Sequence, residues 1–515
     1  MKKAIVFNNS AFVFPQTEAM FEDAEELKQA GYDVLVVRCG RSLEACFCNP
    51  EGYSAICLYC EACHKNMYRL LSKGFGFERI RRMPAKSSKF NIRTMQDIKA
   101  IVYRGVYVGY GVLSSYATAI RGGNFEFANS EVAILERKLN EACAYVDAIC
   151  EILDKEKPDV ISIFNGRLIE ARPFFDLARF RNIKVRVVET VAGELGTREW
   201  RRIVYNGCLP HDIDANTQQV IDLWNSSPLP VEERRQIGEE FFRRKVAGLQ
   251  MNDVDISFTH AQTKGLLPNG FDPSAKNIVI FNSSEDEFIS VGREFDQYDI
   301  FSNQIVGIRA ICDALKDTEY KVVIRMHPNL SSVTDKYVTS LYDLPNEYPN
   351  VTVVPPDSMV SSYTLLFNAE KVVTFGSTIG IEAVYWNKPS VLLRGAYYMK
   401  LGGCYVPKTP AEAVELVKAE LMPQGSEGAI KYGFWVMKNH LTGMPMTRFH
   451  CKLKSFRPRF IFGKWLTPEC LTVGGSAAMA TLIARFLNWM PWIMSPRKVK
   501  WPKKLFCTYK VIAKR

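Results

Sequence analysis

Short polar groups follow several apolar, β-branched runs of this 515-residue sequence. Parallel α/β sheets bind ligands outside the carboxyl ends of their strands, so polar residues at these positions could form a binding site. Asn, Gly and Ser also form ordinary turns, which makes any single group weak evidence. Three such groups in one predicted domain, at residues 282–284, 327–329 and 376–378, are stronger evidence. The five groups are residues 8–10, 165–167, 282–284, 327–329 and 376–378.

The group around Ser377 and Thr378 has the composition of an anion site. A predicted strand ends at Phe375, a small-residue turn follows, and a helix is predicted to begin near Thr378. The free N–H groups and the dipole of a helix start attract anions, and the two hydroxyls add donors. Glu382 would lie one turn into this helix, where it could accept hydrogen bonds from ribose hydroxyls. Alternatively, it only compensates the helix dipole.

His327 leaves another predicted strand and is followed by Pro328 and Asn329. Proline restrains the backbone at this point. A histidine there could donate to a phosphate oxygen or protonate a leaving group. The alternative is a structural hydrogen bond. Ser283 and Ser284 end the first strand of the same region and could contact the same diphosphate or its sugar.

Strands and helices alternate along the chain, and this pattern predicts parallel sheets covered on both faces. Helices are predicted at residues 17–29 and 303–315. We expect two Rossmann-like domains facing each other across a cleft: residues 1–265, with insertions at 40–150 and 200–255, and residues 266–425. The predicted strands are residues 4–7, 33–37, 159–164, 184–189, 277–281, 321–326, 351–354, 371–375 and 390–393.

Composition and missing motifs exclude several classes. Hydrophobic residues make up 47% of the chain, so a largely disordered protein is excluded. Fourteen cysteines in 515 residues are too few for a disulfide scaffold. No Walker A motif is present, and no GxGxxG follows the first strand. The apolar run after Met1 is too short for a signal peptide, so we expect a cytoplasmic protein.

The C-terminal region resembles capsule polysaccharide biosynthesis proteins, a bacterial family. The resemblance rests on the motifs Phe-Asn-Ser-Ser-Glu-Asp-Glu-Phe at 281–288, Arg-Met-His-Pro-Asn at 325–329 and Phe-Gly-Ser-Thr-Ile-Gly-Ile-Glu-Ala at 375–383. It covers about residues 275–425 and is weaker over 1–250. These proteins are similar to GT-B glycosyltransferases such as Kdo transferases and bacterial sialyltransferases.

The resemblance implies an activated-sugar donor in the C-terminal domain and an acceptor on the N-terminal side. His327, Ser377 and Thr378 would then bind the donor phosphate and Glu382 the nucleotide ribose, with Ser283, Ser284 and Asn329 beside them. Inverting enzymes of this type take a carboxylate base from the N-terminal domain. The acidic-acidic-Gly motif of sialyltransferases has no convincing copy here.

Two carboxylates are candidates for the base: Glu189, expected at a strand end, and Glu194 in the next loop. Asn165 and Arg167 would hold the acceptor or a phosphate, although Arg167 could instead be a salt-bridge partner. We expect transfer to need no metal, because the helix dipole, His327 and hydroxyls replace the cation that stabilises the departing phosphate.

Several soft metal ligands fall within a short stretch: Cys39, Cys46, Cys48, Cys57, Cys60, Cys63 and His64. A Cys-x2-Cys pair with upstream cysteines fits a structural zinc site, and the resemblance suggests Cys39, Cys46, Cys57 and Cys60 as its ligands. The Cys-x2-Cys-x2-Cys spacing also fits an iron–sulfur site. A set of buried free thiols is the alternative without metal.

Residues 426–515 are predicted as a basic, partly apolar tail. From residue 448 onward the sequence has 15 basic residues and one acid, Glu469, whereas the preceding residues have a net charge of −3. Residues 471–494 are largely apolar, with tryptophans at one end. This composition favours an element in the lipid headgroup region; packing on the body and a membrane span are alternatives. We expect no nucleic-acid partner.

Together these features predict a glycosyltransferase that takes a nucleotide-sugar donor. It would act on a growing capsule, O-antigen or lipopolysaccharide chain, or a lipid-linked acceptor, peripherally on the inner face of the cytoplasmic membrane. Alternatives are a sugar-nucleotide epimerase of GT-B-like fold and a non-catalytic polysaccharide-assembly or lipid-binding protein.

Overall fold

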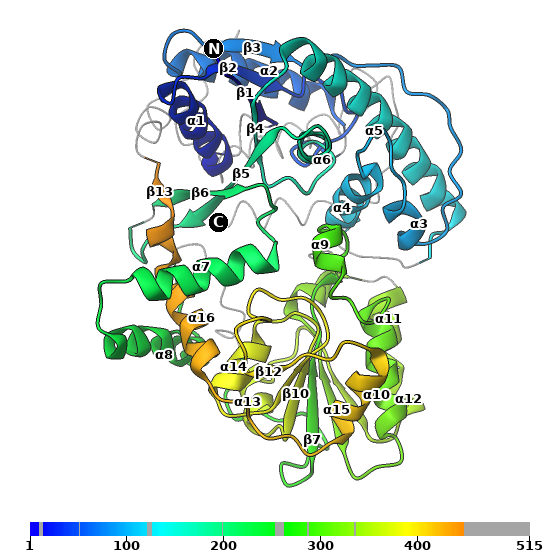
Figure 1. Cartoon of the computed structure of the whole chain (residues 1–515). Coiled ribbons are helices and arrows are strands. Elements are labelled where there is room, and N and C mark those ends of the chain that lie inside the picture. The colour runs from blue at the N-terminus through cyan, green and yellow to red at the C-terminus, as the bar shows by residue number, and fades with distance from the viewer. Residues whose placement is uncertain are drawn as a thin grey trace.

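The structure is a computed structural model of the whole chain. It describes residues 1–9, 14–50, 52–120, 126–197, 199–252, 262–285, 288–333 and 336–446. Two α/β domains follow one another along the chain, each built on its own sheet (Figure 1). This is the two-domain α/β architecture predicted from the alternating pattern.

The N-terminal sheet has the strand order β13-β6-β5-β4-β1-β2-β3. The strands from β3 to β5 are parallel, whereas β6 runs antiparallel to β5 and β13 antiparallel to β6. The central strand β1 is buried because its alternate side chains pack on both faces of the sheet. The strands are β1 (Lys3–Asn8), β2 (Asp33–Arg38), β3 (Gly76–Arg79), β4 (Val160–Phe164), β5 (Lys184–Ala192), β6 (Trp200–Asn206) and β13 (Met444–Pro445).

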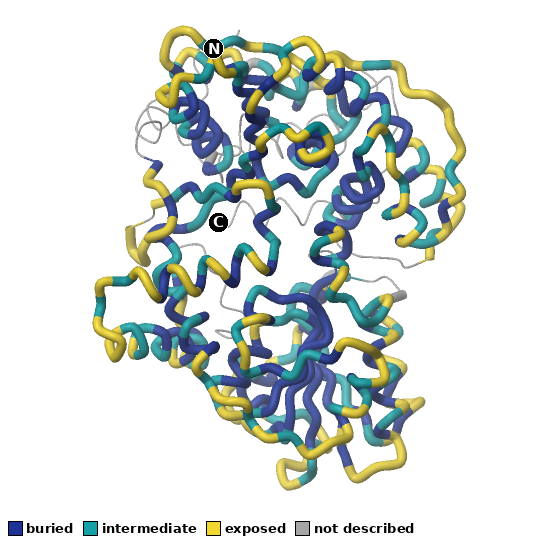
Figure 2. The backbone as a smooth tube through the Cα atoms, in the orientation of Figure 1, coloured by how far each residue is buried: buried dark blue, intermediate teal, exposed yellow. Residues whose placement is uncertain are grey.

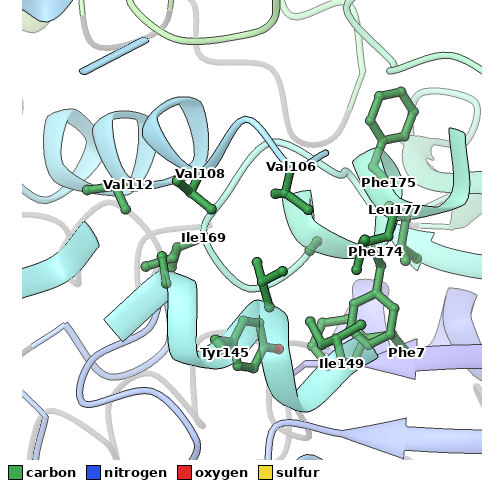
Figure 3. Packing of buried hydrophobic residues seen from close by; sticks show 14 of the residues in the cluster. Phe7, Val106, Val108, Val112, Tyr145, Ile149, Ile169, Phe174, Phe175 and Leu177 are labelled. Carbon is green, nitrogen blue, oxygen red and sulfur yellow. The ribbon is translucent and has the colours of Figure 1, made fainter. Parts of the chain in front are cut away.

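One apolar core fills the face of this sheet that carries the predicted insertion. Figure 3 shows Phe7 of β1 beside Phe174, and their rings stack with centroids 4.5 Å apart. Tyr145 and Ile149 of helix α5 (Asn129–Glu156) pack into the same core. The helices of this domain are α1 (Phe14–Gln29), α2 (Ser54–Met67), η1 (Tyr68–Leu70), α3 (Met95–Lys99), α4 (Val108–Ile120), α5 (Asn129–Glu156) and α6 (Arg172–Phe180).

The C-terminal sheet is parallel throughout, with the order β12-β11-β10-β7-β8-β9. All five residues of its central strand β7 are buried, and Figure 2 shows the strands of this sheet in dark blue, with exposed loops at their lower ends. The strands are β7 (Asn277–Phe281), β8 (Lys321–Arg325), β9 (Val351–Val354), β10 (Lys371–Thr374), β11 (Ser390–Leu392) and β12 (Cys404–Tyr405).

Short helices surround this second sheet. The longest begins after Asn303, whose side chain accepts a hydrogen bond from the backbone N–H of Val306 at 2.9 Å and so caps it. The helices are α9 (Arg293–Asp296), α10 (Gln304–Leu315), η3 (Pro328–Ser332), α11 (Lys336–Tyr342), α12 (Leu344–Glu347), α13 (Ser362–Phe367), α14 (Ile379–Tyr385) and α15 (Pro410–Lys418).

Two helices in the predicted insertion at 200–255 pack against the C-terminal domain. They are α7 (Ile213–Ser226) and α8 (Val231–Ala247). Phe242 of α8 stacks on Tyr385 with ring centroids 4.1 Å apart. The apolar faces of these helices are therefore buried on C-terminal side chains, although the chain order places them in the first predicted domain.

The predicted tail begins with ordered elements that return toward the N-terminal domain. Helix α16 (Glu427–Lys438) packs against α7 and α8, and η4 (Asn439–Thr442) leads to β13 at the sheet edge (Figure 1). Met444 pairs with Arg202 of β6. The rest of the tail, residues 447–515, lies outside the described residues, as does its apolar stretch at 471–494.

Candidate functional site between the two domains

Three polar loops meet at the carboxyl edge of the C-terminal sheet. Strand β7 lies between β8 and β10, so the residues that follow it can contact both neighbours. Ser283 Oγ donates to the carbonyl oxygen of Phe375 at 2.8 Å, and Asn282 Oδ1 accepts from the backbone N–H of His327 at 2.8 Å. The structure thus brings together the three loops that the sequence singled out.

The Ser283 hydroxyl is occupied by this cross-strand hydrogen bond. The backbone N–H of Ser283 donates to Gln304 Oε1 at 2.8 Å. Ser283 and Ser284 are both buried. Ser283 therefore holds the loop in place, and a direct contact with a ligand stays a prediction for both serines.

His327 is a neutral imidazole in this environment. Burial, together with the neighbouring Arg325 guanidinium, lowers the pKa of His327 to about 4. Its Nδ1 accepts a hydrogen bond from the backbone N–H of Asn329 at 3.2 Å, which places the imidazole proton on Nε2. This tautomer suits donation to a phosphate oxygen better than protonation of a leaving group.

The turn after β10 is shaped by Gly376, whose φ is +91°. Ser377 is half-buried and Thr378 is exposed at the start of α14. The N–H groups of Gly380 and Ile381 donate to the carbonyls of Ser377 and Thr378, both at 3.1 Å, so these two N–H groups are not open to an anion. The two hydroxyls are the clearer donors of this turn.

Glu382 lies on the inner face of α14. It is 2% exposed, and its Oε2 accepts a hydrogen bond from the hydroxyl of Tyr363 in α13. A ribose hydroxyl would have to use Oε1 or compete with Tyr363. The contact between Glu382 and a ribose therefore stays a prediction, and it requires a free Oε1 or displacement of the Tyr363 hydroxyl.

On the N-terminal side, Asn165 joins two predicted residues. It follows β4 with a left-handed backbone (φ +58°). Its Nδ2 donates to Glu189 Oε2 at 2.8 Å, while its Oδ1 accepts from the backbone N–H of Arg167 at 3.3 Å. Burial raises the pKa of Glu189, although Asn165 and Arg167 act in the opposite direction. A carboxylate with a raised pKa is suited to general-base chemistry.

Glu189 was predicted to end its strand, and this prediction is wrong. Strand β5 continues to Ala192 and pairs with β6 as an antiparallel hairpin, with Glu189 opposite Ile203. Glu194 lies in the exposed turn of this hairpin, where its carbonyl accepts from Thr197. Of the two carboxylates, it is Glu189 that the structure places beside Asn165 and Arg167.

Three further residues belong to this group and were not predicted. Burial raises the pKa of Tyr397, which comes from the C-terminal domain, and the Glu189 carboxylate contributes to the rise. Burial and Glu189 also act on Tyr205, whose pKa is raised to about 12. Burial and Arg167 lower the pKa of His211 to about 3. Tyr397 of the C-terminal domain therefore lies within electrostatic range of Glu189 and Arg167.

Tight packing surrounds both half-sites, and Leu209 meets Gly292 across the domain boundary, where a Cβ added at Gly292 would lie 3.3 Å from Leu209. A Cβ added at Gly376 would lie 3.0 Å from the carbonyl oxygen of Gly395, and one at Gly395 would lie 3.0 Å from Ile213. A Cβ at Gly166 would lie 2.7 Å from Leu209. A pocket at this domain boundary is lined by Leu209 and His211 from one side and by Gly292 and Phe295 from the other.

Tyr397 could have been found from the sequence because it follows the predicted strand at 390–393, where the strand-end rule applies. His211 had no such signal. It stands in a segment that the sequence predicted only as an insertion.

The cysteine-rich segment surrounds a second pocket, at the carboxyl ends of β1 and β2. Cys39, Cys46, Cys57 and Cys60 all line it, with Cys48 and His64. Both ring nitrogens of His64 are buried without a hydrogen-bond partner, and burial raises the pKa of Cys46 and of Cys57. Within the described residues, no three His, Cys, Asp or Glu side chains are placed to hold a metal ion. The four-cysteine zinc site stays a prediction.

A membrane-spanning helix is not found among the residues that the structure describes.

Residues 190–408 match the family model of capsule polysaccharide biosynthesis proteins. This match confirms the predicted resemblance over the region that contains His327, Ser377, Thr378, Glu382 and Tyr397. A search of curated proteins finds no match.

Solved structures give more distant similarities. The chain is similar to the β-Kdo 2,4 transferase KpsC of Thermosulfurimonas dismutans (12% identity, TM-score 0.34, 54% of this chain and 79% of that chain covered). It is also similar to UDP-GlcNAc 2-epimerase of Neisseria meningitidis (13% identity, TM-score 0.26, 86% and 99% covered). A third is the calicheamicin glycosyltransferase CalG4 (14% identity, TM-score 0.22, 95% and 99% covered).

Proposed function

We propose that this protein is a glycosyltransferase that moves a sugar from a nucleotide-activated donor to a growing cell-surface polysaccharide. One observation carries the proposal: the region that matches capsule polysaccharide biosynthesis proteins folds His327 and the turn at Ser377 and Thr378 onto one sheet edge. The N-terminal carboxylate Glu189 is within electrostatic range of Tyr397 in the C-terminal domain, which supports its role as the base.

In the proposed reaction the donor nucleotide lies on the C-terminal domain. The Nε2–H of His327 and the hydroxyls of Ser377 and Thr378 donate to its phosphate oxygens. These donors stabilise the negative charge that develops as the bond between phosphate oxygen and anomeric carbon breaks. The leaving nucleotide keeps the electron pair of that bond.

The acceptor hydroxyl approaches from the N-terminal side. Glu189 removes its proton, and the acceptor oxygen forms the new bond to the anomeric carbon. Asn165 orients the carboxylate through its 2.8 Å hydrogen bond, and Arg167 holds the acceptor or a phosphate. No resident metal enters these steps, and we expect full activity in a chelator; strict Mg²⁺ dependence of the chemical step would contradict this.

A nucleotide screen tests the donor site. Calorimetry with CMP, CDP, UDP, GDP and dTDP is expected to show binding of one nucleotide and to identify the donor class. A sugar-nucleotide epimerase would bind a nucleotide as well. NMR of the matching nucleotide sugar without acceptor separates the two, because only an epimerase interconverts the free sugar nucleotide.

Two further elements of the proposal are tested separately. A structural zinc ion at Cys39, Cys46, Cys57 and Cys60 predicts about one zinc per chain in purified protein, lost in a Cys57→Ser, Cys60→Ser variant. Zero bound zinc or iron would end this idea.

Peripheral attachment through residues 447–515 predicts that the protein sediments with anionic vesicles and that high salt reduces this sedimentation.

A further inference from the structure

The loop at residues 282–285 is continuous in sequence with a segment that docks on the N-terminal domain. Residues 288–299, including α9, belong to the C-terminal half of the chain but contact α4 and α6. Figure 1 shows α9 beside α4, at the junction of the two domains. The same chain segment thus touches the donor side and the acceptor side.

Asp296 makes the central contact of this junction. Its Oδ2 accepts from Lys99 Nζ at 2.6 Å and from the hydroxyl of Tyr110 at 2.9 Å. The side chains of Lys99 and Asp296 are 15% and 18% exposed, so water screens this ion pair less than a surface pair.

Ser290 and Val291 of the same segment also bond to the N-terminal domain. Ser290 Oγ donates to the carbonyl oxygen of Tyr110 at 2.9 Å. Arg172 is buried, is paired with Asp176, and donates through Nη1 to the carbonyl oxygen of Val291 at 3.1 Å. The segment is therefore fixed to the N-terminal domain at three residues: Ser290, Val291 and Asp296.

The C-terminal end of the segment, at Asp299, is tied to the loop at residues 282–285, here called the donor loop. Arg394 pairs with Glu285 at 3.0 Å and with Asp299 at 2.9 Å. Gln304 donates to Glu285 and accepts from the backbone N–H of Ser283. The backbone N–H of Asp299 donates to the carbonyl oxygen of Asp296 at 3.0 Å. A displacement of Asp296 therefore reaches Ser283 along one chain of hydrogen bonds and ion pairs, which runs through Asp299, Arg394, Glu285 and Gln304.

We infer that Lys99 and Tyr110 are positioning residues for the donor loop, acting through Asp296 from the opposite domain. This inference rests on the proposed function for its consequence: a nucleotide on the donor loop and the position of the N-terminal domain stabilise each other. Such coupling is reciprocal, so weakening the domain contact also weakens nucleotide binding.

The test compares two lysine substitutions. Lys99→Met removes the junction contact, whereas Lys89→Met removes a solvent-exposed ion pair with Glu136 in the same domain. We expect Lys99→Met to accelerate amide hydrogen exchange in residues 282–285 of the free protein and to weaken binding of the nucleotide from the screen about fivefold. Lys99→Arg should restore both, and Lys89→Met should change neither.

Unchanged exchange at 282–285 in Lys99→Met would overturn the inference, whether or not any nucleotide binds. Failure of the proposed function looks different: no nucleotide binds to the wild type, while the exchange difference is still present. If Lys99→Met does not fold, Asp296→Asn probes the same contact from the other domain and is expected to give the same exchange difference.

Discussion

The two halves of the candidate site are built in different ways. On the C-terminal side, two hydrogen bonds connect three neighbouring strand ends at the carboxyl edge of a parallel sheet: Asn282 accepts one from His327, and Ser283 donates one to Phe375. On the N-terminal side, Glu189 lies in a strand that continues into a hairpin, and its carboxylate accepts hydrogen bonds from the Asn165 side chain and from the backbone N–H of its neighbour Thr190. The difference suggests a preorganised donor site opposite an acceptor site whose chemistry rests on one carboxylate.

Glu189→Gln is expected to have the largest effect, because it removes the general base on the acceptor side and leaves the donor side intact. Loss of a general base lowers the transfer rate by a factor of about 10²–10⁴, while nucleotide affinity should stay unchanged. Glu194→Gln is the matched control, since Glu194 lies in the exposed turn. Single-turnover rates and calorimetry measure the two quantities. Equal losses in both variants would remove Glu189 from its proposed role.

The pH dependence of the transfer rate is expected to report the acceptor side, through the ionisation of Glu189. Glu189 acts as a base only when ionised, and burial raises its pKa above the ordinary glutamate value. The rate should therefore fall as the pH falls through this raised pKa, by about tenfold per pH unit below it. A pH–rate profile under single-turnover conditions measures this, and a profile that is flat down to the ordinary glutamate range would contradict it.

His327→Ala changes the donor half and has a smaller effect. Loss of a hydrogen bond to a charged phosphate weakens nucleotide binding by about 1.5–3 kcal/mol. Because the pKa of His327 is about 4, the difference between wild type and variant should be constant between about pH 6 and 8. A difference that grows toward pH 6 would show that the charged imidazole binds instead.

Ser283→Ala and Thr378→Ala give the smallest effects and distinguish structure from contact. Ser283 holds the Phe375 carbonyl in a buried hydrogen bond, so its loss should lower the free energy of unfolding by about 1 kcal/mol. Thr378 is exposed, so its substitution should leave stability unchanged and weaken only nucleotide binding. Denaturant unfolding and calorimetry give both numbers; a reversed pattern would exchange the roles.

The sequence predicted the donor side better than the acceptor side for physical reasons. Buried parallel strands are continuous apolar runs, and β7 was predicted with its observed bounds, residues 277–281. Strand β6 was missed, because Arg201 and Arg202 interrupt its apolar pattern. Arg202 is nevertheless buried, because it pairs with Asp23 and Glu26 of α1.

The partners of the site residues depend on contacts that are remote in sequence. The strand-end rule placed His327 and Ser377 correctly at one sheet edge, because parallel strands share the direction of their ends. Asp296 and Lys99 are 197 positions apart, and local spacing cannot reveal such a pair. The approach of Tyr397 to Glu189 likewise depends on how the two domains meet.

Calorimetric titration of the nucleotide panel onto three proteins tests the central claim most directly: wild type, His327→Ala and Glu189→Gln. We expect that one nucleotide binds to the wild type, that His327→Ala weakens this binding, and that Glu189→Gln leaves it unchanged. Absence of binding by every nucleotide to the folded wild type would contradict the proposed donor site, as would equal weakening in both variants.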